Sequence, residues 1–182
     1  GATLEVYGEG QDDAEKRCHV LAKEDGLTVI HPFDDPYVIA GQGTIALELL
    51  EDLPTLDTVV GGLSGGGLLS GVGVVLKSSD PHCRIVGVSP ERGATMYKSI
   101  KAGKPMVIAE QDTLADSLLG GIGLNNQYTF QMVQQYVDDI VLIEEKAIAN
   151  GIGFMLDQHR MAVEGAAVAG IGAILNKKVH LG

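Results

Sequence analysis

Short apolar, β-branched runs alternate along the chain with longer segments whose apolar residues recur at helical spacing. The runs predict strands at residues 3–7, 27–31, 58–62, 84–89, 139–143 and 179–181. The helical spacing predicts helices at residues 13–24, 38–51, 67–77, 94–102, 128–137, 145–159 and 164–175, with a long glycine-rich connection over 106–126. This alternation is typical of parallel βαβ units, so we expect an α/β fold with a mostly parallel sheet and flanking helices.

Composition narrows the functional classes. The 182 residues carry a formal charge of -11, and this acidic balance argues against a nucleic-acid-binding surface. No apolar run approaches the length of a membrane span, and the first residues do not form a signal peptide. Cys18 and Cys83 are too few for a disulfide framework, so we expect free thiols and a cytoplasmic location.

The sharpest local feature is a glycine loop. The predicted strand at 58–62 runs into Leu63-Ser64-Gly65-Gly66-Gly67, and the next predicted helix begins at once. Consecutive glycines allow several backbone N–H groups to point into one concavity, and a helix N-terminus adds partial positive charge. The loop therefore predicts a phosphate site that needs no lysine or arginine. The alternative is a tight strand-to-helix turn without a ligand.

The same loop leaves the kind of phosphate open. Gly65, Gly67 and Gly71 resemble the spacing of a dinucleotide-binding fingerprint. Glu91 lies where an acid that binds ribose would follow. A nicotinamide-dependent oxidoreductase is therefore the first alternative, and a non-catalytic module that binds a phosphate ligand is the second.

Several segments, in order, resemble one enzyme family. They are residues 31–44 (HPFDDPYVIAGQGT), the loop at 64–68 (SGGGL), residues 113–117 (TLADS), 137–139 (VDD) and 163–166 (VEGA). Together they resemble the pyridoxal-phosphate (PLP) enzymes of the threonine/serine dehydratase and serine racemase family. The strings at 61–67 and 114–126 are most similar to its hydroxyectoine-utilisation dehydratase branch.

The resemblance implies a type II PLP-enzyme fold, with residues 1–40 as the second half of a small domain and 41–182 as most of a large domain. It implies that the glycine loop holds the PLP phosphate and that two further side chains lie beside the cofactor ring. The cofactor-binding residues implied are Ser64, Gly65, Gly66, Gly67, Leu68, Ser117 and Glu164. For Glu164 the alternative is an ordinary acid at a helix N-terminus.

The catalytic residue that the resemblance implies is not found in this chain. The family's Schiff-base lysine lies in a segment upstream of the matched motifs, and none of the nine lysines here has that context. We expect that the chain lacks an N-terminal segment and the C-terminal end of the fold, and that it is inactive alone.

No metal site is expected. In serine racemase-like relatives a divalent cation is bound just after the strand that corresponds to 84–89. Here Ser89 and Thr95 stand where that resemblance would place acids, and Glu91 alone is a poor site for a hard cation. His31 and His159 lack partners at ligand spacing, so we expect structural roles for both.

These observations together predict a PLP-dependent dehydratase, an ammonia-lyase. The resemblance implies that it deaminates a β-hydroxy amino acid such as threonine or serine, or a hydroxyectoine-pathway intermediate. Its partner would be a small-molecule substrate, without nucleic acid or membrane, and we expect a homo-oligomer.

Overall fold

The computed structural model describes residues 1–180 as a three-stranded parallel sheet with helices on both faces. The strands are β1 (Thr58–Gly62), β2 (Arg84–Pro90) and β3 (Asp139–Ile143), in that order across the sheet. The register pairs Val60 with Val86, and Val88 with Val141. The predicted α/β class and parallel sheet are confirmed.

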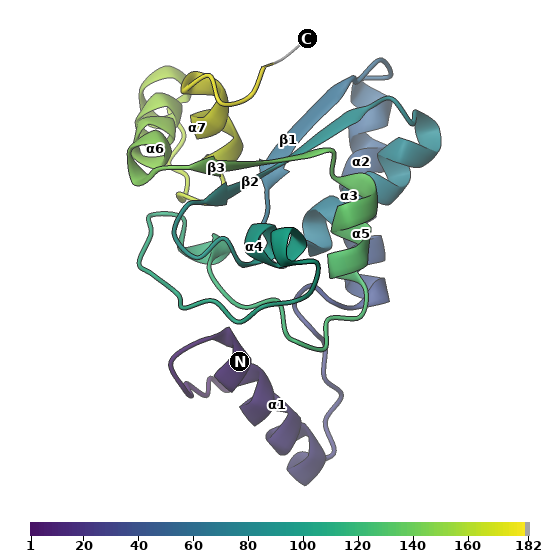
Figure 1. Cartoon of the computed structure of the whole chain (residues 1–182), viewed down its shortest axis with the longest axis vertical. Helices are drawn as coiled ribbons and strands as arrows, with labels where there is room; N and C mark the ends of the chain where they lie inside the picture. Colours follow the sequence, from purple (N-terminus) through teal and green to yellow (C-terminus); the bar gives the residue numbers. More distant parts are fainter. Residues whose placement is uncertain (181–182) are drawn as a thin grey trace.

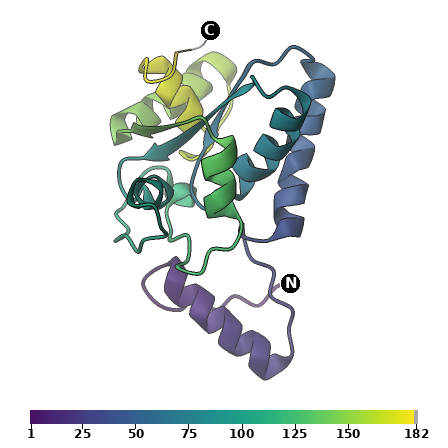
Figure 2. The same ribbon diagram turned by 45° about the vertical axis from the view of Figure 1, so that its right-hand side comes forward.

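The helices form two layers around this sheet. Figures 1 and 2 show α6 and α7 gathered at one side of the strands, with α2, α3 and α5 at the other. The bounds are α2 (Pro36–Asp52), α3 (Gly67–Ser79), α4 (Thr95–Ala102), α5 (Thr129–Tyr136), α6 (Glu145–His159) and α7 (Ala169–Leu175).

Alternating residues of β2 pack in two hydrophobic clusters, one on each face of the sheet. Ile85 packs in the cluster with Leu69, Leu76 and Val133, whereas Val86 and Val88 pack in the cluster with α6 and α7. Successive side chains of a strand point to opposite faces, so one strand feeds both layers. Between them, Gly87 leaves the space that Leu63 occupies, because a Cβ there would lie 2.8 Å from Leu63 Cδ2.

The N-terminal segment differs from this body. Helix α1 (Gln11–Asp25) buries no residue, and both figures show it set apart from the sheet. The strands predicted at 3–7 and 27–31 are wrong: both segments lie beside α1 without ladder pairing. Their apolar pattern is that of a strand, but a strand also requires a paired neighbour for its backbone groups.

Two other expectations need correction. The helix predicted at 164–175 begins only at Ala169, so Glu164 precedes it in an irregular stretch and is not an acid at a helix N-terminus. The strand predicted at 179–181 is not formed at Val179 or His180, and Leu181 lies outside the described residues. The connection at 106–126 is present, with one short 3-10 turn, η1 (Asp116–Leu118).

Candidate phosphate-binding site

The glycine loop lies where β1 ends and α3 begins. Gly65, Gly66 and Gly67 are buried, and Gly66 has φ +90°, a left-handed conformation that favours glycine. Leu68, in the first turn of α3, is 38% exposed. The loop therefore turns sharply from the sheet into the helix, as the sequence predicts.

The backbone N–H groups of this loop are unusual because they have no acceptor. Among hydrogen bonds between described residues, none uses the N–H of residues 64–68 as its donor, although Ser70 N–H bonds the Gly66 carbonyl. No side chain caps α3, and its first turn holds no acidic residue. Buried N–H groups normally have partners, so this cluster of donors fits a bound anion such as a phosphate group.

Both sides of the loop are closely packed. A Cβ on Gly65 would lie 2.4 Å from Phe33 ring carbons, and a Cβ on Gly66 would lie 2.8 Å from Val133 Cγ2. A Cβ on Gly67 would lie 2.9 Å from Phe33 Cβ. The glycines are therefore required by close approach on two sides, in addition to the positive φ of Gly66.

The two other predicted residues lie together next to this loop. Ser64 Oγ donates to the Leu119 carbonyl at 3.3 Å, which joins the glycine loop to the end of η1. Ser117, within η1, donates its hydroxyl to Glu164 Oε2 at 2.9 Å. The structure thus brings Ser117 and Glu164 into contact and joins their neighbourhood to Ser64. The Ser64 hydroxyl is therefore already bonded to a carbonyl, and only its backbone N–H has no acceptor within the described residues.

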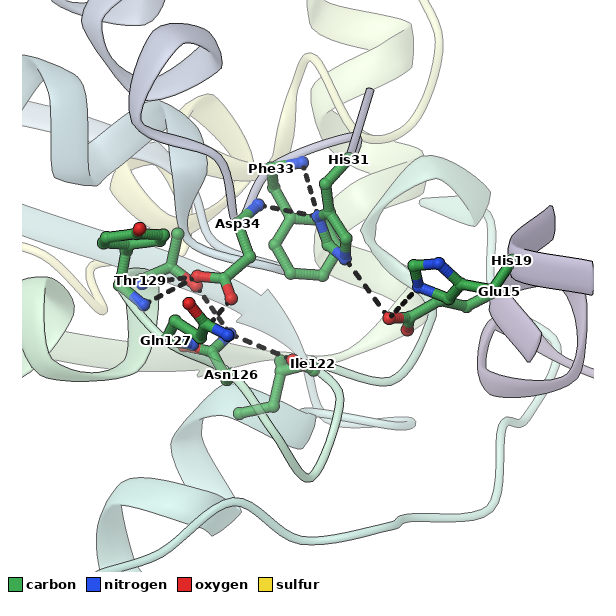
Figure 3. A network of polar contacts seen from close by, with 10 residues as sticks. Glu15, His19, His31, Phe33, Asp34, Ile122, Asn126, Gln127 and Thr129 are labelled. Atoms are coloured by element: carbon green, nitrogen blue, oxygen red, sulfur yellow. Dashed lines mark hydrogen bonds and ion pairs between the residues drawn. The ribbon is translucent and has the colours of Figure 1, made fainter. Parts of the chain in front are cut away.

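Two carboxylates that hold the site together were missed at the sequence level. Glu145, at the start of α6, accepts hydrogen bonds from the Thr113 hydroxyl and from Leu114 N–H at 2.8 Å, and so fixes the segment before η1. Asp34 accepts from the N–H groups of Gln127, Tyr128 and Thr129, as Figure 3 shows. Asp34 belongs to the motif at residues 31–44, and Glu145 contacts the motif at 113–117. The hydrogen-bond partners of both carboxylates are far away in the sequence.

The structure shows the surroundings of His31, of Ser89 and of the two cysteines. His31 has the structural role expected, because its Nδ1 accepts from Asp34 N–H at 2.8 Å. Ser89 is buried and donates its hydroxyl to the Leu63 carbonyl at 2.6 Å. Within residues 1–180 no three His, Cys, Asp or Glu side chains are grouped to hold a metal ion. Cys18 and Cys83 are free thiols, as predicted.

The lysine of α3 does not reach the glycine loop. Lys77 is in the last turn of α3 and pairs with Asp138 at 2.8 Å. Ten residues of helix place it about 15 Å along the axis from Gly67. The hydrogen-bond donors that the loop itself offers are therefore backbone N–H groups.

An open cleft lies beside the site and not within it. It measures about 1070 Å³ and lies between α1 and residues 121–128, with His31, Asp34 and Tyr128 in its wall. No residue of the glycine loop lines it. No described helix is long and apolar enough to cross a membrane.

Comparison with known proteins identifies the family to which this chain belongs. The family described as pyridoxal-phosphate dependent enzymes matches the chain along residues 1–182. The chain belongs to this family. PLP is thus the family's cofactor, and the fold that carries the glycine loop is the type II PLP-enzyme fold.

Individual members of the PLP family are similar to this chain in sequence or in structure. L-threonine ammonia-lyase of Thermotoga maritima is 40% identical over 177 residues, covering 97% of this chain and 44% of its own length. The catabolic L-threonine dehydratase of Escherichia coli K12 is 34% identical over 178 residues, covering 98% and 54%. Maize serine racemase superposes with a TM-score of 0.88 at 32% identity, covering 98% and 53%. The chain therefore spans about half the length of these relatives.

Proposed function

We propose that this chain is the phosphate-binding part of a PLP-dependent ammonia-lyase that deaminates a small β-hydroxy amino acid, threonine or serine. The observation that carries the proposal is the set of N–H groups at residues 64–68 that have no acceptor among the described residues. The names of the T. maritima and E. coli relatives support the reaction and the substrate class.

Each part of the site has a role in this proposal. The N–H groups of Ser64, Gly65, Gly66, Gly67 and Leu68 hold the phosphate, with α3 adding the partial positive charge of its N-terminus. Ser117 and Glu164 would contact the bound cofactor, and the Ser117 hydroxyl orients the Glu164 carboxylate. PLP supplies the electron sink for α-proton removal, while the protein supplies orientation.

The nicotinamide alternative has little support. Glu91, the residue that would bind ribose, is exposed beyond the end of β2, and the family match favours PLP. Nothing specific supports a non-catalytic module either.

Finer features of the proposal concern the whole protein. The strings at 61–67 and 114–126 favour the hydroxyectoine-utilisation branch, whose substrate would be a pathway intermediate in place of threonine. We also propose a homo-oligomer in the cytoplasm.

The domain division at residue 40 is part of the same proposal. Exposed apolar side chains of the N-terminal segment, such as Leu4, Val6 and Ile30, fit a small domain whose other half covers them. The proposal keeps residues 1–40 in the small domain and 41–182 in the large domain, with Phe33 of the first range packed against the glycine loop.

The test compares ligands side by side on the full-length protein that carries this chain. PLP should raise the melting temperature, because a ligand at a hundred times its Kd adds about 2.7 kcal/mol. NAD and NADP should not, and Glu91→Ala should leave PLP protection unchanged. Release of ammonia from threonine or serine should require PLP. Protection by a dinucleotide but not by PLP would overturn the proposal.

A further inference from the structure

The N-terminus of α5 is closed by side chains from two places. Asp34 Oδ2 accepts from Gln127 N–H at 2.7 Å, and its Oδ1 accepts from Tyr128 and Thr129 N–H, both at 2.9 Å. Asn126 Oδ1 accepts from Phe130 N–H at 2.8 Å. Four consecutive N–H groups, at residues 127–130, are thereby satisfied, three of them by one carboxylate.

Helix α5 forms one wall of the glycine loop. Val133 Cγ2 and Thr129 Cβ would lie 2.8 and 3.3 Å from a Cβ on Gly66. Thr129 and Val133 are one turn apart on the same face of the helix and are both buried. The position of α5 therefore fixes one side of the loop backbone.

The residue next to Asp34 forms the other wall. Phe33 packs against Gly65 and Gly67, at 2.4 and 2.9 Å from their hypothetical Cβ atoms. His31 Nδ1 holds this turn of the chain by accepting from Phe33 N–H at 3.3 Å and Asp34 N–H at 2.8 Å. Figure 3 shows His31, Phe33 and Asp34 on one segment, with the Asp34 carboxylate directed at residues 127–129.

We propose that Asp34 is a positioning residue for PLP binding: its carboxylate ties the Phe33 wall to the α5 wall and so sets the glycine loop between them. This inference rests on the proposed function. Without the carboxylate the two walls are free to separate, and the loop N–H groups no longer converge on one phosphate.

Asp35 provides a matched control in the adjacent position. It accepts from Tyr37 N–H at 2.8 Å and Val38 N–H at 3.0 Å, and so caps only its own helix, α2. Both aspartates bond the N–H groups of a helix start, so their removal costs similar stability. Only Asp34 joins the two walls.

The experiment measures PLP affinity and melting temperature in the full-length protein after removal of PLP, for Asp34→Asn, Asp34→Ala and Asp35→Ala. Asp34→Asn keeps the shape but places an amide against Gln127 N–H, so PLP affinity should fall about tenfold. Asp34→Ala should lose more, and Asp35→Ala less than about twofold at a comparable drop in melting temperature. Equal losses of affinity at equal losses of stability would overturn the inference.

A second measurement needs no PLP. Amide hydrogen exchange should quicken at residues 127–130 and also at 64–67 in Asp34→Asn, but only near 37–39 in Asp35→Ala. Faster exchange confined to 127–130 would show a local cap and would contradict the inference. If the unsubstituted protein fails to bind PLP, the proposed function is wrong, but hydrogen exchange still tests whether Asp34 sets the glycine loop. If the unsubstituted protein binds PLP and Asp34→Asn binds it equally well, only the inference about Asp34 is wrong.

Discussion

The N-termini of α2 and α5 have an aspartate as acceptor, whereas the N-terminus of α3 has no side-chain acceptor within residues 1–180. Asp35 accepts from the first N–H groups of α2, and Asp34 accepts from those of α5. Helix α3 begins instead with three glycines, no acid and no side-chain cap. All three starts carry the same partial positive charge, so the difference lies in which group satisfies it.

The contrast separates a structural helix start from one that is available to a ligand. A side chain that caps a helix uses up the donors and occupies the space in front of them. The start of α3 keeps its donors, and the Cβ positions of its glycines are closely packed on two sides. In the proposed function, this is the place that the phosphate group takes.

The largest expected effect comes from filling that place. Gly66→Val would put a β-branched side chain at φ +90° and against Val133 and Met96. Loss of even one or two charge-assisted hydrogen bonds should weaken PLP binding by tenfold or more, at about 1.5–3 kcal/mol per bond. Equilibrium binding of PLP to the full-length protein measures this. Gly41→Val is the control, because nothing lies within 4 Å of its Cβ; equal losses in both variants would refute the special status of α3.

A smaller effect should follow if α3 is given its own anion. Leu68→Glu places a carboxylate in the first turn, where it stabilises the helix by about 0.3–1 kcal/mol. The same charge repels a phosphate, so PLP affinity should fall several-fold while the melting temperature holds or rises. The uncharged Leu68→Gln distinguishes charge from shape, and a similar loss of affinity in both variants would rule out the electrostatic explanation.

Removing the cap of α2 should affect stability alone. Asp35→Ala should lower the free energy of unfolding by about 1 kcal/mol, the usual value of an N-cap side chain. Urea unfolding measures the change, and PLP affinity should stay within about twofold. A large loss of PLP affinity would show that the two helix starts are not independent.

The smallest expected effect is on stability and concerns Asp138, whose carboxylate is paired with the Lys77 ammonium group. Burial of the Asp138 carboxylate raises its pKa, but hydrogen bonds from Lys77 and from Ile85 N–H together lower it below its ordinary value. The lowered pKa adds stability above the ordinary value near 4, and this is lost as pH falls through the folded-state pKa.

Because the Asp138 side chain is 40% exposed, solvent screens the pair and its contribution should stay under about 1 kcal/mol. The difference in unfolding free energy between the unsubstituted protein and Asp138→Asn should therefore shrink as the pH falls below the ordinary carboxyl pKa near 4. A difference that is independent of pH would contradict this assignment.

Much of this arrangement could be predicted because it is local in sequence. The apolar periods predicted β1, β2, β3 and most of the helices of the body, and the run of glycines predicted the turn into α3. The strands predicted at 3–7 and 27–31 failed because periodicity cannot show whether a partner strand exists. The late start of α7 similarly depends on packing, because Gly165 lies against the Leu114 carbonyl, where a Cβ would not fit.

The supporting carboxylates were beyond sequence reasoning for a different reason. Asp35 could be interpreted as a cap because Pro36 and a helix follow at once. Asp34 and Glu145 have the same chemistry, but their partners lie 93 and 31 residues away. A single sequence contains no signal for such pairings, so the residues that support the site appear only in the folded chain.

The separation between Asp34 and Gln127 also has a consequence for how the protein folds. Closing a flexible loop of 93 residues costs on the order of 4 kcal/mol of chain entropy, so such contacts tend to form after local ones. The turn at 65–67 and the cap at Asp35 can form early, from neighbouring residues. Helix α5 can dock beside the glycine loop only after β2 and the helix that follows it have assembled. A refolding chain should therefore regain most of its helix before it regains the ability to bind a phosphate.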